Sequence, residues 1–464
     1  MRELIQIHIG KAGNSIGNEY WNLISQEHNL TPDGTINDSS DLTNDYKDVL
    51  FNELSTNHYS PRAILLDTEP TAIESLLTNS TMRNVCPDNI IYGMNGTGNC
   101  WARGFGSQSR ELMPYVEDSI RKEVERCDSF QGFQIFHAIS GGTGGGLCSA
   151  VQPVLHEMYP NAIFANYTLI PAENATLTPF ETYNSTFSME NLINYSHMVI
   201  SYDNNSLYYL CEKKLNLEKY SFDEVNKIIA MGISDITSTT RFHSENSASL
   251  RKISTNLVEY PYHHFFLMTN SQLDSRYRNL NKTPSTLDII KDITDFEYTT
   301  CYFQLKRSKE ENRKQWLWMF CLAFFLRGNC SYGEIIDYYK EFTNTYCFYV
   351  AMPCHSSCYI SHRKPIGVAA CGTSLNHNKE IGKIYRWWDM DKLQRGKPFF
   401  SYYKKEGITK EYMDYFVDEI SSYASTYDNY GGPQIYDRGN DWENTGKRLY
   451  TEEEERQGEE EVYE

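Results

Sequence analysis

The strongest chemical signal in the sequence is a glycine-rich run, Ser140-Gly-Gly-Thr-Gly-Gly-Gly146, which lies between an apolar run and a helical pattern. Glycines allow backbone N–H groups to approach an anion closely, and the partial positive charge at a helix N-terminus attracts the same ligand. Thr143 can add a hydroxyl donor. The run therefore indicates a phosphate-binding loop, with a purely structural turn as the alternative.

Two further glycine-rich turns could meet this run around one polyphosphate. Gly10-Lys-Ala-Gly-Asn-Ser-Ile-Gly17 opens the first helical pattern, and residues 96–104 contain the other turn. These turns have neither the Gly-x-Gly-x-x-Gly spacing of dinucleotide-binding folds nor the P-loop that ends in Gly-Lys-Ser/Thr. An oxidoreductase that uses a dinucleotide is therefore disfavoured.

These loops need a sheet to position them, and the sequence predicts one. Short runs rich in β-branched or aromatic residues are followed by turn signals and, repeatedly, by helical patterns; the runs are 4–9, 63–66, 133–139, 163–170 and 198–202. This alternation predicts an α/β fold with a doubly wound, mostly parallel sheet, whose ligands bind at the carboxyl ends of the strands. Residues 316–326 predict a further strand, covered on both faces.

The predicted organisation has four parts. They are a nucleotide-binding domain at residues 1–205, an intermediate α+β domain at 206–380, a C-terminal helical region at 381–430 and an acidic tail at 431–464. An apolar stripe at helical spacing predicts a connecting helix at about 222–241. The tail is predicted to be disordered because it is polar and acidic.

The charge of the chain excludes some classes of function. Its 464 residues carry a formal net charge of −18, and the segment Glu452–Glu464 alone contains eight Glu and one Arg. We expect no nucleic-acid binding from so acidic a chain, and basic partners suit it better. The longest apolar run is too short to span a membrane and the start lacks a secretory signal, so we expect a cytosolic protein with reduced cysteines.

The motifs together resemble those of the tubulin family, from Met1 to the acidic tail. The run 140–146 resembles the glycine-rich tubulin signature, and Asp67-Thr-Glu69-Pro70 resembles the acidic loop that handles magnesium near the γ-phosphate. Pro171 and the segment Glu181–Asn184 resemble the ribose loop. The resemblance implies GTP and Mg²⁺ as ligands, and two carboxylates also suit a hard cation that is bound mainly through water.

The resemblance also implies which residues contact the nucleotide. Asn204 and Asn226 match the asparagines that read guanine, and Phe222 stands where the family stacks a tyrosine. An Asn amide supplies both donor and acceptor to a base edge, although each Asn taken alone is more often a helix cap or turn residue. The residues assigned to the nucleotide are Lys11, Glu69, Gly98, Asn99, Ala138, Gly142, Thr143, Gly144, Glu181, Asn204, Phe222 and Asn226, with Glu69 and, through water, Asp67 assigned to the metal.

Lys252 helps to indicate whether the chain resembles an alpha or a beta tubulin. The start, Met1–Leu4, is similar to that of a beta chain, and Lys252 stands where alpha tubulin carries the Glu that activates water on the neighbouring subunit's GTP. A lysine cation can steady a phosphate but cannot act as a general base at neutral pH. The resemblance therefore implies no catalytic residue in this chain, and hydrolysis only after an alpha-type subunit docks. A solvated surface lysine is the plainer alternative.

The function implied by the resemblance is that of a divergent, beta-like microtubule subunit in the cytoplasm, with cilium or spindle as specialised sites. Its acidic tail would bind basic motor or microtubule-associated proteins. However, Ser247 and Ser249 stand where the inter-subunit loop normally has Asn and Asp. The alternative is therefore a GTP-binding relative that regulates assembly without polymerising.

Other departures from the family pattern lie at the expected phosphate site. Lys11 replaces a Gln, Ala138 replaces a Ser, and Gly145 stands where Ser, Thr or Ala is usual. Lys11 could strengthen phosphate binding through its charge. Cys354-His-Ser-Ser-Cys358 could suggest a zinc site, but it lacks paired Cys-x-x-Cys units and its surroundings predict strands.

Overall fold

The computed structural model describes residues 2–36, 46–55, 57–78, 81–171, 178–242, 249–258, 263–270, 299–301, 319–327, 333, 354–356, 366–374 and 398–431. The chain divides into two compact units, Met1–Tyr427 and Asp428–Glu464. The site described below lies in the first unit. Residues 432–464 of the predicted acidic tail lie outside the described residues, and the four-part domain division stays a prediction.

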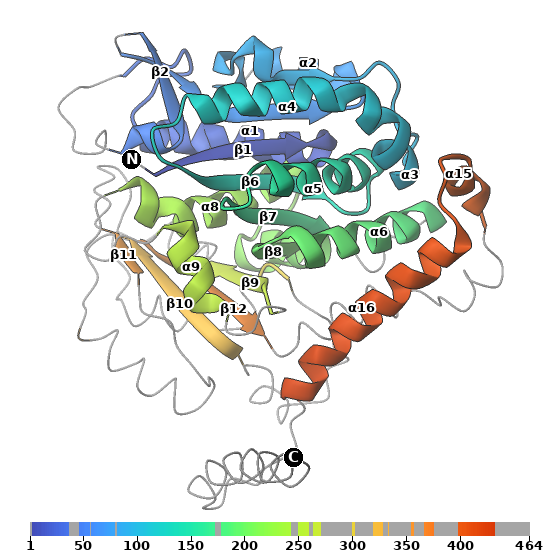
Figure 1. Cartoon of the computed structure of the whole chain (residues 1–464). Coiled ribbons are helices and arrows are strands. Elements are labelled where there is room, and N and C mark those ends of the chain that lie inside the picture. The colour runs from blue at the N-terminus through green and yellow to red at the C-terminus, as the bar shows by residue number, and fades with distance from the viewer. Residues whose placement is uncertain are drawn as a thin grey trace, which may run out of the picture. The chain divides into compact units, whose positions relative to one another are not determined.

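A largely parallel sheet forms the centre of the first unit (Figure 1). In the order β5-β4-β1-β6-β7-β8-β9, each strand is parallel to its neighbours. These strands are β1 (Glu3–Ile9), β4 (Ala63–Asp67), β5 (Ile90–Tyr92), β6 (Phe130–Ala138), β7 (Ile163–Ile170), β8 (Met198–Asp203) and β9 (Phe265–Asn270). Strands β1, β4 and β8 are buried at every residue, as expected for parallel strands covered on both faces. The predicted α/β, doubly wound fold is confirmed.

The sheet continues beyond β9 with a change of direction. Strand β12 (Ile366–Ser374) is antiparallel to β9, β10 (Met319–Arg327) is antiparallel to β12, and β11 (Cys354–Ser356) is parallel to β10. Strand β10 overlaps the strand predicted at 316–326, of which residues 316–318 lie outside the described residues. A short hairpin of β2 (Phe51–Ser55) and β3 (His58–Pro61) stands apart from the main sheet.

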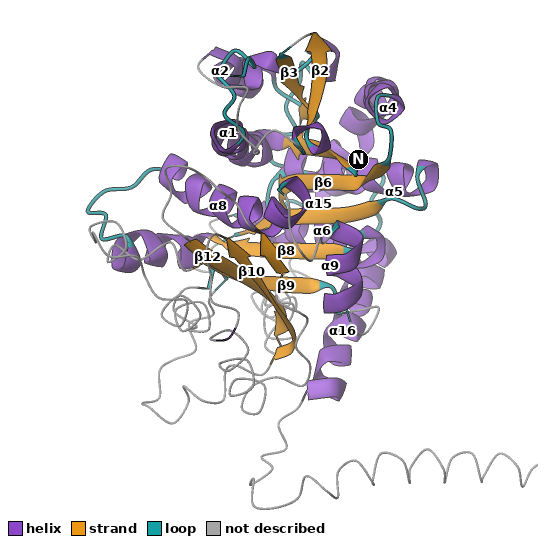
Figure 2. Cartoon of the chain, turned by 90° about the vertical axis from the view of Figure 1, so that its left-hand side faces the viewer, coloured by secondary structure: helices purple, strands orange, loops and turns teal. Residues whose placement is uncertain are grey.

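Helices cover both faces of the parallel strands, with α1 and α8 on one side and α4 and α5 on the other (Figure 2). The α-helices of the described residues are α1 (Gly10–Glu27), α2 (Pro70–Thr78), α3 (Trp101–Arg103), α4 (Ser109–Glu125), α5 (Cys148–Met158), α6 (Pro179–Tyr195), α7 (Asn204–Tyr209), α8 (Phe222–Arg241), α9 (Leu250–Leu257), α15 (Phe400–Lys405) and α16 (Lys410–Gly431). They are joined by short 3-10 helices η2 (Lys47–Val49), η3 (Thr81–Asn84) and η4 (Pro87–Asn89) and by π-helical turns η5 (Gly104–Gln108), η6 (Gly142–Leu147) and η7 (Leu210–Lys214). Among them, none combines the length and the apolarity that crossing a membrane would require.

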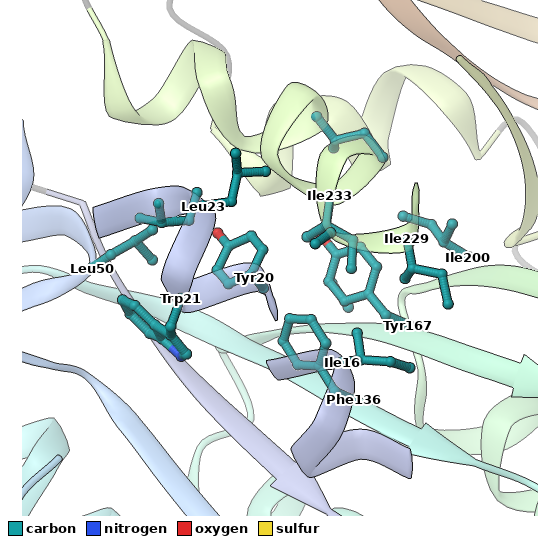
Figure 3. Packing of buried hydrophobic residues seen from close by; sticks show 14 of the residues in the cluster. Ile16, Tyr20, Trp21, Leu23, Leu50, Phe136, Tyr167, Ile200, Ile229 and Ile233 are labelled. Carbon is teal, nitrogen blue, oxygen red and sulfur yellow. The ribbon is translucent and has the colours of Figure 1, made fainter. Parts of the chain in front are cut away.

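Each face of the sheet has its own hydrophobic core, because side chains alternate along a strand. On one face, Phe136 and Tyr167 of the strands pack with Tyr20 of α1 and Ile233 of α8 (Figure 3). On the other face, side chains such as Ile7 pack with α4 and α5. This arrangement fixes α1 and α8 side by side on the sheet, and α1 begins where β1 ends.

Helix α8 matches the connecting helix predicted at about 222–241. Its predicted apolar stripe is buried, including Val225, Ile229 and Ile236. A capping box defines its start: the Asp223 amide donates to the Ser221 hydroxyl at 3.2 Å, and the Ser221 amide donates to the Glu224 carboxylate at 2.8 Å.

Candidate nucleotide site

The candidate site lies at the carboxyl ends of β1 and β6, where the chain leaves neighbouring strands in opposite directions. From β1 the sheet extends to β4 and β5, and from β6 it extends to β7 and β8. Such a switch point opens a crevice for ligands in parallel sheets. The two glycine loops meet there, since a Cβ placed on Gly10 would lie 3.0 Å from the Gly144 amide nitrogen. Gly10 has φ +73°, a conformation that favours glycine.

The glycine-rich run begins a helix whose first amides have no side-chain cap. Gly141 is the N-cap of η6, which continues directly into α5. The first N–H groups of a helix lack partners within the helix, and a glycine N-cap has no side chain to supply one. A Cβ on Gly141 would approach nothing closer than the Gly144 nitrogen at 3.9 Å, so the space in front of this residue is open. The arrangement fits an external anion.

The glycines deeper in the run have a different purpose, which the sequence did not reveal: they allow loops to pack together. A Cβ on Gly142 would lie 2.6 Å from both the Cys100 nitrogen and the Thr97 hydroxyl. A Cβ on Gly146 would lie 2.3 Å from the Trp101 carbonyl oxygen. Contacts that short do not occur, so side chains at these positions would push the two loops apart.

Gly145, a departure from the family pattern, has a local explanation in this chain. A Cβ there would lie 2.3 Å from the Ser188 hydroxyl oxygen and 2.9 Å from the Ile139 carbonyl oxygen. Ser188 occupies this space because its hydroxyl donates to the carbonyl of Asn184 at 2.7 Å.

Thr143 links three loops through its hydroxyl. It lies 2.7 Å from the hydroxyl of Thr68, in the loop after β4, and 3.4 Å from that of Thr97, in the loop after β5. The expected hydroxyl donor is therefore engaged with other threonines. Sequence reasoning missed Thr68, although its place between Asp67 and Glu69 was a signal.

The two acidic residues expected at the metal lie at the end of β4 in different surroundings. Asp67 is buried, and its Oδ1 accepts from the amides of Thr68 at 2.7 Å and Glu69 at 3.3 Å. Its Oδ2 is buried without a hydrogen-bond partner among the described residues. Burial raises the pKa of Asp67, and the two amides oppose that effect. The Glu69 carboxylate is exposed and packs against Gly96, where a Cβ would lie 1.9 Å from its Oε1.

These residues fit Mg²⁺. No cluster of three or more His, Cys, Asp or Glu side chains suited to a metal occurs in the described parts of the chain. Mg²⁺, however, commonly uses one or two carboxylates, completing its shell with water and phosphate oxygens. The unpartnered Oδ2 of Asp67 is an acceptor available to such a water.

The remaining residues expected at the phosphates and ribose lie around this crevice. Lys11 is exposed in the first turn of α1, and Ala138 ends β6 with its carbonyl oxygen 2.7 Å from the Cβ position of Gly144. Gly98 and Asn99 are exposed, with φ of +58° and +57°. Glu181 is half-buried in the first turn of α6, and burial raises its pKa.

A cation missed in the sequence lies beside this loop. The Arg103 Nη1 atom is 3.6 Å from the Cβ position of Gly98, and the side chain is exposed. Arginine can bind phosphate oxygens through two N–H groups at once. Its place within the third glycine-rich turn was the available signal.

The residues expected at the base lie where α7 and α8 begin. Asn204 starts α7 and is half-buried, while the N-cap is Asp203, whose carboxylate accepts from the Asn205 and Ser206 amides at 3.2 and 3.3 Å. Because Asp203 fills the capping role, Asn204 is not needed for it. On α8, Asn226 is buried and Phe222 is 68% exposed.

Helix α8 carries two of the residues expected at the base, and it packs beside α1, which begins at the expected phosphate site. Lys227, Asp223 and Glu224 of α8 lie close enough to Glu19 of α1 to influence its pKa, which is raised mainly by burial. Asn226 is therefore on the helix segment that runs beside α1. The structure brings Gly10, Thr68 and Thr97 against Thr143, and Asp67 directly precedes Thr68. Among the described residues, no hydrogen bond or ring contact joins Asn204, Phe222 and Asn226.

Lys252 lies away from these loops in sequence and is exposed in the first turn of α9. Its amide donates to the hydroxyl of Ser249, the N-cap of this helix, at 3.3 Å. Ser249 therefore has a local capping role, while Ser247 lies outside the described residues.

Comparison with known proteins supports a common origin for the whole chain. Residues 3–212 match the family model described as "Tubulin/FtsZ family, GTPase domain". The chain is 30% identical over 434 residues to the nucleomorph tubulin beta chain of Guillardia theta, covering 93% of this chain and 96% of the relative. It is 29% identical over 443 residues to the tubulin beta-2 chain of Emericella nidulans (94% and 96%), and 28% identical over 464 residues to the tubulin beta chain of Trichophyton rubrum (99% and 100%).

Proposed function

We propose that this chain, which belongs to the tubulin family, is a beta-like subunit that pairs with an alpha-type tubulin and enters microtubules. As a member of the family it is a cytoskeletal GTP-binding protein. The observation that carries the proposal is the uncapped helix start at Gly141, at the β1–β6 switch point. Its loop is joined through Thr143 to Thr68, the residue after Asp67, whose Oδ2 has no hydrogen-bond partner among the described residues.

The phosphates of GTP would be bound mainly by backbone amides. The first amides of η6, at Gly142, Thr143 and Gly144, would donate to phosphate oxygens, and Lys11 would add a cation from the start of α1. Asp67 and Glu69 would hold a hydrated Mg²⁺, which when bound neutralises charge on the phosphates. These backbone and carboxylate groups do not distinguish guanine from adenine.

Guanine would be read by side chains at the other end of the site. Asn204 and Asn226 would form hydrogen bonds with the base edge, and Phe222 would stack on its face in place of a tyrosine. The large exposed fraction of Phe222 suits a ring that becomes covered when a ligand binds. Pro171 and Glu181 would contact the ribose.

Hydrolysis would require a neighbouring alpha-type subunit. Lys252 cannot remove a proton from water at neutral pH, so it would face the partner's GTP and steady it, while the partner supplies the general base for the GTP of this chain. We place the protein in cytoplasmic microtubules, with cilium or spindle arrays as specialised sites. Its acidic tail would bind basic motor or microtubule-associated proteins.

Co-sedimentation of tagged protein with microtubules assembled from ordinary tubulin and GTP tests the proposal. Electron microscopy then separates incorporation into the lattice from binding to its side. Incorporation is expected. Protein that retains GTP but stays out of the lattice would contradict the microtubule role and support the regulator that does not polymerise.

A matched pair of variants tests the role of Lys252. Lys252→Ala should reduce co-assembly with an alpha-type subunit, because the charge toward the partner's GTP is lost. Arg251→Ala is the control, since the Arg251 guanidinium donates to the Asn161 carbonyl within this chain. Equal effects of the two substitutions would count against an inter-subunit role for Lys252.

A further inference from the structure

One buried amide, that of Asn184 on α6, connects two loops of the nucleotide site to the C-terminal helices. Its side chain is completely buried. Oδ1 accepts from the Trp101 amide at 2.8 Å and from the Tyr403 hydroxyl at 2.7 Å. Nδ2 donates to the carbonyl oxygens of Asn99 and Ser140, both at 2.9 Å.

These four hydrogen bonds use both ends of the amide and fix its orientation. A flipped amide would place NH₂ against two donors and oxygen against two carbonyl oxygens. Burial raises the pKa of Tyr403, so its hydroxyl stays protonated and donates. Asn184 thus has one arrangement that satisfies all its partners, and an unpaired group here would be costly.

The partners of Asn184 belong to loops that converge on the phosphate site. Asn99 is in the loop after β5, and Ser140 begins the glycine-rich run after β6. Asn184 itself is in the first half of α6, close in sequence to Glu181.

Tyr403 brings the C-terminal helices into this network. It lies on α15, whose aromatic residues pack with Trp101 and Phe187 in a separate hydrophobic cluster that also contains Phe416 of α16. Figure 1 shows α15 close to α3 and to α6, and Phe180 at the start of α6 contacts Tyr403. The phenol ring is held by its neighbours, and the hydroxyl reaches Asn184.

We propose that Asn184 is a positioning residue for the Asn99 and Ser140 loops, and that the Tyr403 hydroxyl couples the packing of α15 to the nucleotide affinity of those loops. This inference rests on the proposed nucleotide site. Thermodynamic coupling is reciprocal. A ligand that orders the loops therefore also stabilises α15, and a perturbation of α15 weakens ligand binding.

Tyr403→Phe tests the coupling with the smallest change, because it removes one hydroxyl and keeps the ring. Loss of one buried hydrogen bond to the positioning amide should raise the GTP dissociation rate about three- to tenfold. The control is Tyr167→Phe: Tyr167 is also buried, and its hydroxyl accepts from the Gln134 amide at 3.0 Å in the middle of the sheet. The control should leave GTP dissociation unchanged, although it also removes a buried hydroxyl.

Hydrogen exchange supplies a readout that does not depend on nucleotide. In nucleotide-free protein, Tyr403→Phe should speed amide exchange at residues 96–101 and 140–146, and Tyr167→Phe should not. If both variants lose thermal stability to a similar extent, with GTP dissociation and loop exchange unchanged, Tyr403 is only structural and the proposal is overturned. If the wild-type chain binds no guanine nucleotide, the proposed function fails, while loop exchange still decides the positioning role.

Asn184→Asp perturbs the same hydrogen-bond network more strongly than Tyr403→Phe does. Its carboxylate would place an oxygen against the two carbonyl oxygens of Asn99 and Ser140, and GTP affinity should fall about tenfold or more. A variant that folds and binds GTP as tightly as wild type would overturn the positioning role. If this variant does not fold, Tyr403→Phe remains the deciding measurement.

Discussion

The helices that begin at the phosphate end of the candidate site differ from those that begin at the base end. Helices α1 and η6 have Ile9 and Gly141 as N-caps, with no side-chain hydrogen bond to the helix. Helices α7 and α8 are capped by Asp203 and Ser221. The first amides of α1 and η6 therefore remain available to a ligand. The first amides of α7 and α8 are bound by their own caps, so neighbouring side chains remain to recognise the base. In the proposed site, the two ends would therefore use different chemistry: backbone amides for the anion and side chains for the base.

The largest expected effect comes from filling the space between loops at the phosphate end. Gly142→Ala should lower GTP affinity by roughly 100-fold, because its Cβ would lie 2.6 Å from the Cys100 nitrogen and force the loops apart. Gly141→Ala is the comparison: its Cβ would enter the open space in front of the loop, with its nearest protein atom at 3.9 Å and an extended backbone. It should leave the loops packed and lower GTP affinity less. Titration with a fluorescent GTP analogue compares them, and equal affinities would contradict the assigned loop packing.

The next largest effect, a loss of GTP affinity on changing Asp67, should appear only when Mg²⁺ is present. Asp67→Asn should lower GTP affinity about ten- to a hundredfold when Mg²⁺ is present, since outer-sphere partners of a metal commonly contribute that much. With EDTA, the variant and wild type should bind GTP alike. An equal loss with and without Mg²⁺ would argue against a metal role.

A change at the base end should alter selectivity rather than total affinity. Asn204→Asp should reduce binding of GTP about tenfold and spare other purine nucleotides, because a carboxylate cannot donate to the guanine edge. Asn205→Asp, the neighbouring residue on α7, is the control. Competition of GTP and ATP for the site measures the shift. Equal losses for both nucleotides would place Asn204 outside the base pocket.

The smallest expected effect is on the free energy of unfolding alone, and GTP affinity should stay unchanged. Burial raises the pKa of Glu190 on α6 to about 7, with Glu419 of α16 adding repulsion, and the Asn194 amide donates to both carboxylates at 3.0 and 2.9 Å. The folded chain binds more protons than the unfolded chain between pH 4.5 and about 7, so stability should fall as pH rises through that window.

Glu190→Gln should remove this pH dependence and stabilise the chain at pH 8 by on the order of 1 kcal/mol. Thermal unfolding at pH 5 and pH 8 checks the change, and GTP affinity is the internal control. A wild-type protein that becomes more stable as pH rises through this window would refute the assignment.

The sequence predicted the fold better than it predicted the contacts within the site. The predicted strands and the helix at 222–241 were found because periodicity and turn signals are local. Thr68 with Thr143, and Asn184 with Tyr403, are partners separated by 75 and 219 residues. No local pattern encodes such pairs, because they depend on strand order.

The glycine-rich run shows the same limit within a single motif. Its composition indicated a loop near an anion, and Gly141 fits that interpretation. The composition could not distinguish Gly141, which faces open space, from Gly142 and Gly146, which face other loops. That distinction depends on Cys100 and Trp101, which come from a separate turn.

The contact between Gly145 and Ser188 constrains the order in which this chain could change during evolution. A side chain at 145 has no room while the Ser188 hydroxyl lies 2.3 Å from the Cβ position. A lineage moving toward the usual Ser, Thr or Ala at 145 would have to shorten or reorient residue 188 and also shift the Ile139 carbonyl oxygen, which lies 2.9 Å from the same position. A lineage that already carries a side chain at 145 could place a serine hydroxyl here only after residue 145 had become glycine. Positions 145 and 188 are therefore expected to vary together among relatives of this chain, with a side chain at 145 only where residue 188 is smaller or turned away.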